Sequence, residues 1–164
     1  MRWLMVWLVA FAAAGWHLPA ANAETRVALV VGNGAYRSTT PLSNPLNDAR
    51  DMAAALKAAG FTVVEALDAG KPQFDSALRT FADKLTNADI ALFFYAGHGI
   101  AVNGTNYLLP VDSDLKSEMD VKLGAAINVD VTLEQTMNVA KVKLVFLDAC
   151  RDHPFAAKIR SASA

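Results

Sequence analysis

The stretch Leu144–Phe155, with the sequence LVFLDACRDHPF, decides how the rest of the chain is interpreted. It begins as an apolar run and changes abruptly to polar residues at Asp148. A continuous apolar run bounded by polar residues is typical of a strand buried on both faces of a parallel sheet. The carboxyl ends of such strands carry the functional residues of α/β proteins. This run leads to Cys150, the only cysteine of the chain, which lies among an aspartate, an arginine and a histidine. A cysteine usually packs as a small buried apolar residue, but this setting is also one that a reactive thiolate would occupy.

A second apolar run, Ile90–Tyr95, ends in a similar way. It leads into a segment in which Gly97 and Gly99 flank His98, and glycines let the backbone turn sharply and a ligand approach closely. If both runs are strands of one parallel sheet, His98 and Cys150 emerge at the same edge. A thiol and an imidazole placed there form a nucleophile and base pair. The alternative is a buried cysteine and a loop histidine that never meet, and the residue types alone leave both readings open.

The rest of the chain alternates between short apolar runs and helical patterns. We expect four buried strands, at Arg26–Val31, Phe61–Ala66, Ile90–Tyr95 and Lys143–Leu147. We expect three helices, from Asn44 or Asn47 to Ala59, from Pro72 to about Leu85, and from Asp130 or Thr132 to about Ala140. The segment 100–109 has the pattern of a β-hairpin that turns at Asn103-Gly104. Strands alternating with helices predict an α/β protein with a parallel sheet and right-handed crossovers.

The composition indicates one domain, because 164 residues with 54% hydrophobic content are enough to bury a core. The formal net charge of −1 gives no sign of a nucleic-acid surface or a polybasic membrane anchor, so neither partner is expected. One cysteine excludes an intramolecular disulfide. The segment GNGAY at Gly32–Tyr36 lacks the third glycine of a dinucleotide fingerprint, so no nucleotide cofactor is expected.

The polar stretch Pro110–Lys122 is rich in carboxylates, namely Asp112, Asp114, Glu118 and Asp120. Carboxylates can bind Ca²⁺, but these lack the spacing of an EF-hand loop. His153 follows Cys150 by three residues, and two such ligands do not make a metal site. We therefore predict a solvated loop and no metal site or cofactor, while calcium dependence stays open.

Residues 1–23 have the layout of a secretory signal peptide. Arg2 supplies a positive start, and Trp3–Ala14 is an uncharged apolar stretch that is too short to span a bilayer comfortably. The Ala-Asn-Ala at positions 21–23 is a small-x-small cleavage site. We expect cleavage after this site and a secreted or periplasmic protein; the alternative is an uncleaved membrane anchor. An unpaired cysteine in an oxidising compartment is more often functional than incidental.

Three segments resemble the caspase-like cysteine peptidases, in particular their bacterial metacaspase-like branch. They are YAGHG at Tyr95–Gly99, LDACRDHPF at Leu147–Phe155 and LSNPLNDAR at Leu42–Arg50. The resemblance extends from Arg26 to about Arg160. It implies a caspase-like three-layer α/β/α fold with a mostly parallel sheet, a catalytic domain over residues 24–164, and a protein or peptide substrate.

The resemblance also implies roles for single residues in a cysteine endopeptidase. Cys150 would attack the scissile carbonyl, and His98 would act as general base and acid. The backbone N–H groups of Gly99 and Cys150 would bind the oxyanion. Asp48 and Asp148 match the acidic positions that bind a basic side chain, which implies cleavage after Arg or Lys. The alternatives are that Asp48 only complements a helix dipole and that Asp148 only tunes the histidine.

Two matters stay open at the level of the sequence. Arg37 and Arg50 are near these aspartates in sequence, and arginines lining the pocket would favour cleavage after aspartate instead. Caspase-like folds continue beyond the cysteine with strands and helices that we expect to be missing here, leaving an apolar sheet edge that promotes self-association. The alternative function is therefore an inactive or fragmentary caspase-like module that acts in protein–protein interaction.

Overall fold

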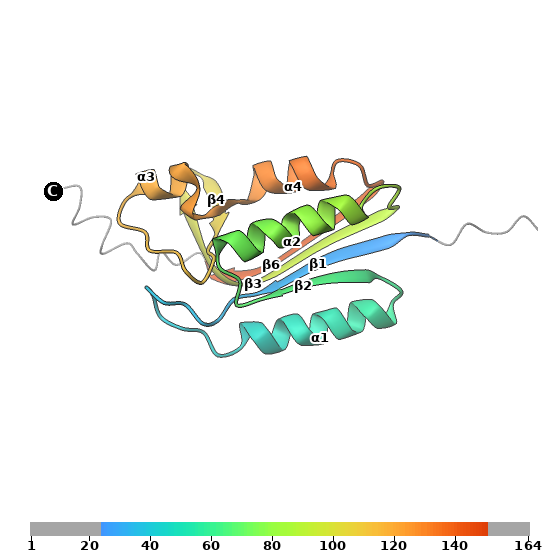
Figure 1. The fold of residues 1–164 in the computed structure, drawn as a ribbon, viewed down its shortest axis with the longest axis horizontal. Coiled ribbons are helices and arrows are strands. Elements are labelled where there is room, and N and C mark those ends of the chain that lie inside the picture. Colours follow the sequence, from blue (N-terminus) through green and yellow to red (C-terminus); the bar gives the residue numbers. More distant parts are fainter. Residues whose placement is uncertain (1–23, 151–164) are drawn as a thin grey trace, which may run out of the picture.

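The structure is a computed structural model that describes residues 24–150. Helix α1 (Pro45–Ala58) covers one face of a central sheet, and α2 (Lys71–Lys84) and α4 (Val129–Met137) cover the other (Figure 1). This arrangement confirms the predicted three-layer α/β fold. The expected leader and the stretch after Cys150, with His153, lie outside the described residues.

The sheet is mixed, so the prediction of a mostly parallel sheet is not accurate. Four strands pair in parallel in the order β2-β1-β3-β6, with bounds β2 (Thr62–Leu67), β1 (Arg26–Gly32), β3 (Ile90–Val102) and β6 (Val142–Cys150). Two short strands, β4 (Thr105–Leu108) and β5 (Ile127–Asn128), extend it in antiparallel pairing from the second half of β3. The cause is the predicted hairpin: Asn103 and Gly104 both have positive φ, at 50° and 82°, as a type I′ turn requires.

Strand β3 is longer than its apolar run. The sequence predicts that the strand ends at Tyr95 and that His98 lies in the loop that follows, but β3 continues through His98 into the hairpin. In the same way β6 reaches Cys150 instead of ending at Leu147. Pairing between neighbouring strands extends both elements past the residues that would form them on hydrophobicity alone, and it places the two candidate catalytic positions inside regular sheet.

The helices begin and end close to their predicted positions. Helix α1 has Asn44 at its N-cap position, and α2 has Pro72 in its first turn, where a missing N–H costs nothing. Helix α4 starts earlier than predicted, because the Asn128 side chain caps it by accepting a hydrogen bond from the N–H of Val131 at 3.0 Å.

Side chains of β3 alternate between two cores. Phe93 and Tyr95 pack on the α2 and α4 side, in a cluster that includes Phe74 of α2. Phe94 and Ala96 pack on the α1 side, with Ala49 and Ala53 among others. The alternation follows from the two-residue repeat of a strand, and it places Phe94 and Ala96 on the α1 side of the sheet.

The acidic stretch 110–122 is not the solvated loop that the sequence predicts. It contains a one-turn helix, α3 (Glu118–Asp120), followed by a π-helical turn, η1 (Val121–Ala125), and it buries Val111, Leu115 and Val121 in a small core of its own. The apolar residues between the carboxylates are the signal that this prediction overlooked.

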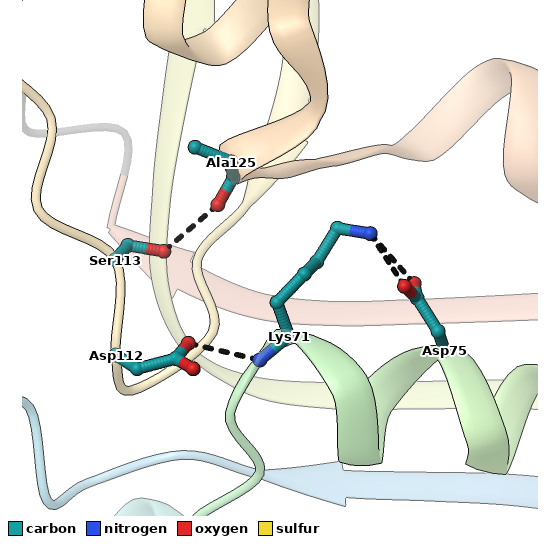
Figure 2. A network of polar contacts seen from close by, with 5 residues as sticks. All are labelled: Lys71, Asp75, Asp112, Ser113 and Ala125. Carbon is teal, nitrogen blue, oxygen red and sulfur yellow. Dashed lines mark hydrogen bonds and ion pairs between the residues drawn. The ribbon is translucent and has the colours of Figure 1, made fainter.

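The carboxylates of this stretch make internal contacts. Asp112 accepts a hydrogen bond at 2.8 Å from the backbone N–H of Lys71, and Ser113 donates one at 3.0 Å to the carbonyl of Ala125 (Figure 2). Asp120 accepts from the N–H groups of Lys116 and Ser117, which hold its pKa below the usual range. Asp112 therefore caps the start of α2 and ties the stretch to it.

Strand β6 pairs only with β3 among the described residues. Its large apolar side chains are between 37% and 49% exposed; they are Val142, Leu144, Val145, Phe146 and Leu147. The sequence predicts a strand buried on both faces, and for residues 24–150 this prediction is wrong. Across that range, too, no helix is both long and apolar enough for a membrane span.

Candidate active site

The candidate site lies at the carboxyl end of the parallel strands. This end carries the loop 33–44 after β1, the hairpin of β3 and β4, and the end of β6, at the left of Figure 1. Strands β3 and β6 pair in parallel over nine residues, and the last pair is His98 with Cys150. Neighbouring strands lie about 4.8 Å apart. The backbone therefore brings together the two positions that the sequence singled out.

The same register decides which face carries the site. Ala96 pairs with Asp148 and packs on the α1 side of the sheet. His98 is two residues beyond Ala96 on the same strand, so its position belongs to the α1 face as well. The imidazole and the first turn of α1 thus share one side of the sheet, away from α2 and α4.

The His98 imidazole is half-buried and oriented by the loop after β1. Its Nε2 lies 2.8 Å from the backbone carbonyl of Thr40, and its ring centroid lies 4.6 Å from that of Tyr36. Because a carbonyl only accepts hydrogen bonds, Nε2 carries the proton in the neutral ring and Nδ1 is the basic nitrogen. Nothing in the sequence indicates Thr40, since a backbone carbonyl has no residue signature.

Gly99 presents its backbone N–H toward the β6 side of β3. Leu109 donates its N–H to the carbonyl of His98 at 3.1 Å, so Gly99 and Leu108 form a non-hydrogen-bonded pair whose N–H groups point away from each other's strand. The carbonyl of Ala96 points to the β1 side, where it accepts from Asn33. The carbonyl of His98 shares that side, so the N–H of Gly99 points to the opposite one, the edge of β3 that pairs with β6 as far as Cys150.

The two candidate specificity residues both lie on the α1 side of the sheet and are exposed. Asp48 is in the first turn of α1, next to Ala49, which packs in one cluster with Ala96. Asp148 is on β6 opposite Ala96. Helix α1 and strand β6, which carry the two carboxylates, therefore both adjoin Ala96 of β3. Ala96 is two residues from His98, so both aspartates lie at the same end of the sheet as the histidine. Arg37 is exposed, and its backbone N–H bonds to the carbonyl of Val111.

Two buried tyrosines contact the backbone of His98, and no sequence pattern assigns them a role. Tyr36 is in the loop after β1 and Tyr95 is on β3, and both hydroxyls bond to the His98 backbone. Burial raises the pKa of Tyr36 to about 12 and raises that of Tyr95 well above its ordinary value, so both are neutral. Tyr95 is indistinguishable from a packing residue in the sequence because it ends an apolar run.

Fold and site together define an α/β protein with a histidine and a cysteine on adjacent parallel strands. Residues 25–163 match the caspase domain family, peptidase C14, and the chain belongs to this family.

Two curated relatives are similar to part of the chain. One is mucosa-associated lymphoid tissue lymphoma translocation protein 1 from Homo sapiens, which is 34% identical over 91 residues. The other is its homolog from Mus musculus, which is 33% identical over 91 residues. These residues are 56% of this chain and 11% of each relative, so the chain spans only about a tenth of the relatives that it matches. Both relatives are mammalian, and the metacaspase-like branch stays a prediction.

Proposed function

We propose that this chain is a cysteine endopeptidase that works through a dyad of Cys150 and His98. The observation that carries the proposal is that these two positions form the last pair of the parallel β3–β6 ladder. Thr40 supports it, because its carbonyl holds the Nε2 proton and leaves Nδ1 as the base. An oriented imidazole beside a thiol is the arrangement that nucleophilic catalysis requires.

The proposed reaction has two steps. His98 takes the thiol proton of Cys150, and the thiolate forms a bond to the scissile carbonyl carbon. The electron pair of the broken C=O π bond moves onto the oxygen, where the N–H groups of Gly99 and Cys150 stabilise it. The carbon–nitrogen bond then breaks, and the leaving amine takes a proton from His98. Water attacks the thioester, gives a proton to His98, and releases the carboxylic acid and the free thiol.

We propose cleavage after Arg or Lys. Asp48 and Asp148 supply two carboxylates on the α1 side of the sheet, and a guanidinium or ammonium relieves the repulsion between them. Charge pairs of this kind are worth a few kcal/mol, so discrimination against Asp of about a thousandfold is expected.

The experiment compares matched reporter peptides that end in Arg, Lys or Asp before the reporter group. Cys150→Ala and His98→Ala should abolish cleavage, and Asp48→Ala and Asp148→Ala should each weaken the preference for Arg. Asp83→Ala is the control, because Asp83 is exposed on α2, on the opposite face of the sheet. Faster cleavage after Asp, or an undiminished Arg preference in Asp148→Ala, contradicts the proposed pocket.

Labelling with a thiol-reactive peptide probe separates an active enzyme from an inactive interaction module. The chain has a single cysteine, so any label reports on Cys150 alone. The proposed chemistry uses only a thiol, an imidazole and backbone N–H groups. We therefore expect labelling to survive EDTA, and loss of labelling that Ca²⁺ restores identifies a calcium requirement.

We also propose export, on the strength of the leader in residues 1–23. A secreted or periplasmic protein whose leader is removed begins at Glu24. Amino-terminal sequencing of the protein from its host tests this, and a mature chain that retains Met1 contradicts it.

A further inference from the structure

Two tyrosine hydroxyls enclose the backbone of His98. The N–H of His98 donates to the Tyr36 hydroxyl oxygen at 2.8 Å, and the Tyr95 hydroxyl donates to the carbonyl of His98 at 2.7 Å. The two hydroxyl oxygens are 3.1 Å apart. Tyr36 is 5% exposed and Tyr95 is fully buried, so water does not compete for these groups.

The protons of this cluster are fully accounted for. Each phenol has one, and the Tyr95 proton goes to the His98 carbonyl, which can only accept. The Tyr36 oxygen accepts a hydrogen bond from the N–H of His98. The Tyr36 hydroxyl can in turn donate to the Tyr95 oxygen or to the carbonyl of Leu109, which is 3.2 Å away. The contacts therefore form a ring that begins at the N–H of His98, passes through the two hydroxyls and returns to the His98 carbonyl.

Gly97 makes room for this ring. A Cβ atom on Gly97 would lie 2.7 Å from each of the two hydroxyl oxygens, and its φ of +155° is one that other residues rarely adopt. A glycine inside a strand weakens it unless another group needs the space. Here the space is filled by the hydroxyls that bond to the next residue.

We propose that Tyr36 and Tyr95 are positioning residues, whose hydroxyl ring fixes the His98 peptide and through it both the imidazole and the N–H of Gly99. A core that needed only packing would be served by two phenylalanines, which bury the same rings without polar groups that must be satisfied. The Tyr36 ring also lies against the imidazole, so one residue contacts both the backbone and the side chain of His98. This inference rests on the proposed peptidase function.

The first test is kinetic and uses the full chain. Tyr36→Phe and Tyr95→Phe should each lower kcat about 10- to 100-fold and leave KM within about twofold, because the reacting groups are displaced and the substrate pocket is not. The double variant should be no slower than the slower single variant, because the ring acts as a unit. Tyr107→Phe is the matched control: Tyr107 is the third tyrosine, on β4, and its hydroxyl is not part of the ring.

The second test separates positioning from structure and does not need a peptidase. The pH profile of Cys150 alkylation by iodoacetamide is measured in each variant. Tyr36→Phe should shift the pH profile of alkylation toward the profile of His98→Ala. In the double variant that carries both substitutions, the profile should be the same as in His98→Ala alone. Tyr95→Phe keeps the Leu109 N–H on the His98 carbonyl, so it provides the same test where Tyr36→Phe does not fold.

The outcomes distinguish the two proposals. If the wild type cuts no peptide but the profile shifts as described, the proposed function fails and the positioning role stands. If the wild type cuts peptides and Tyr36→Phe and Tyr95→Phe cut them equally well, the positioning role fails and the function stands. A shift of equal size with and without His98 also overturns the positioning role, because it shows a general loosening of the fold.

Discussion

Strands β3 and β6 have similar sequences and very different surroundings. Each is an apolar run that ends at a candidate catalytic residue, and the two pair in register over nine positions. β3 has β1 on one side and β6 on the other, with a helix layer over each face. Among residues 24–150, β6 has β3 alone as its neighbour. Phe94 and Phe146 are register partners, yet Phe94 is 6% exposed and Phe146 is 49% exposed.

The difference shows that an apolar run predicts a strand but not the number of its neighbours. His98 is on a strand that has a neighbouring strand on each side. The hydroxyls of Tyr36 and Tyr95 also bond to its backbone. Cys150 is on a strand that pairs with a neighbour on one side only, within residues 24–150. The described structure thus fixes the strand of the proposed base more firmly than the strand of the proposed nucleophile.

The largest effect is expected from truncating the buried member of the phenylalanine pair. Phe94→Ala should lower the free energy of unfolding by about 3–5 kcal/mol, because it removes a fully packed ring and leaves a cavity. Phe146→Ala, the matched variant on the same face, should cost about 1 kcal/mol or less. Urea unfolding measures both, and equal losses would mean that β6 is covered in solution.

A somewhat smaller effect is expected from alkaline pH, through Tyr36. Its folded-state pKa of about 12 lies above the ordinary value of 10, so the folded chain binds more protons than the unfolded chain between these values. The contribution of the Tyr36 proton to the free energy of unfolding is therefore complete below pH 10, and it falls by about 3 kcal/mol as the pH rises to 12. Tyr36→Phe should flatten the loss of unfolding free energy over this range, whereas Tyr107→Phe should not; parallel curves for the two variants would contradict the assignment.

Gly97→Ala should cost about 2 kcal/mol of stability and most of the activity, because its Cβ would displace both tyrosine hydroxyls. Gly104→Ala is the control within the same hairpin. Gly104 has a positive φ but nothing within 4 Å of an added Cβ, so only backbone strain of about 1 kcal/mol is expected, with activity retained. Thermal unfolding and peptide cleavage measure the pair, and an active Gly97→Ala variant would break the link between β3 packing and catalysis.

The smallest effect on stability is expected at the exposed strand, where the change should appear in association instead. We propose that the apolar β6 edge makes the chain self-associate, since exposed apolar edges pair with other chains. Phe146→Lys should reduce the concentration dependence of the sedimentation coefficient and change the unfolding free energy by less than about 1 kcal/mol. Thr62→Lys, exposed on β2 at the opposite edge, should leave association unchanged. A monomeric wild type at all concentrations contradicts the proposal.

Much of the fold was predictable because local chemistry decides it. The apolar runs became strands, Asn44 and Pro72 lie at the helix starts, and Asn103-Gly104 forms the hairpin turn. The prediction of a solvated loop at 110–122 was wrong because it rested on the four carboxylates of this stretch. Three apolar residues between and beside them are buried. The length of β3 was misjudged because cross-strand pairing extends a strand beyond its hydrophobic part.

The sequence by itself determined which residues carry chemistry: a single cysteine and a Gly-His-Gly segment, each closing an apolar run. Only the tertiary structure decided how they are held. The Thr40 carbonyl reaches His98 because the loop after β1 crosses the end of β3, and a backbone group leaves no trace in a sequence pattern. Tyr36 and Tyr95 meet although 59 residues separate them, and hydrogen bonding between hydroxyls depends on distances that only the folded chain defines.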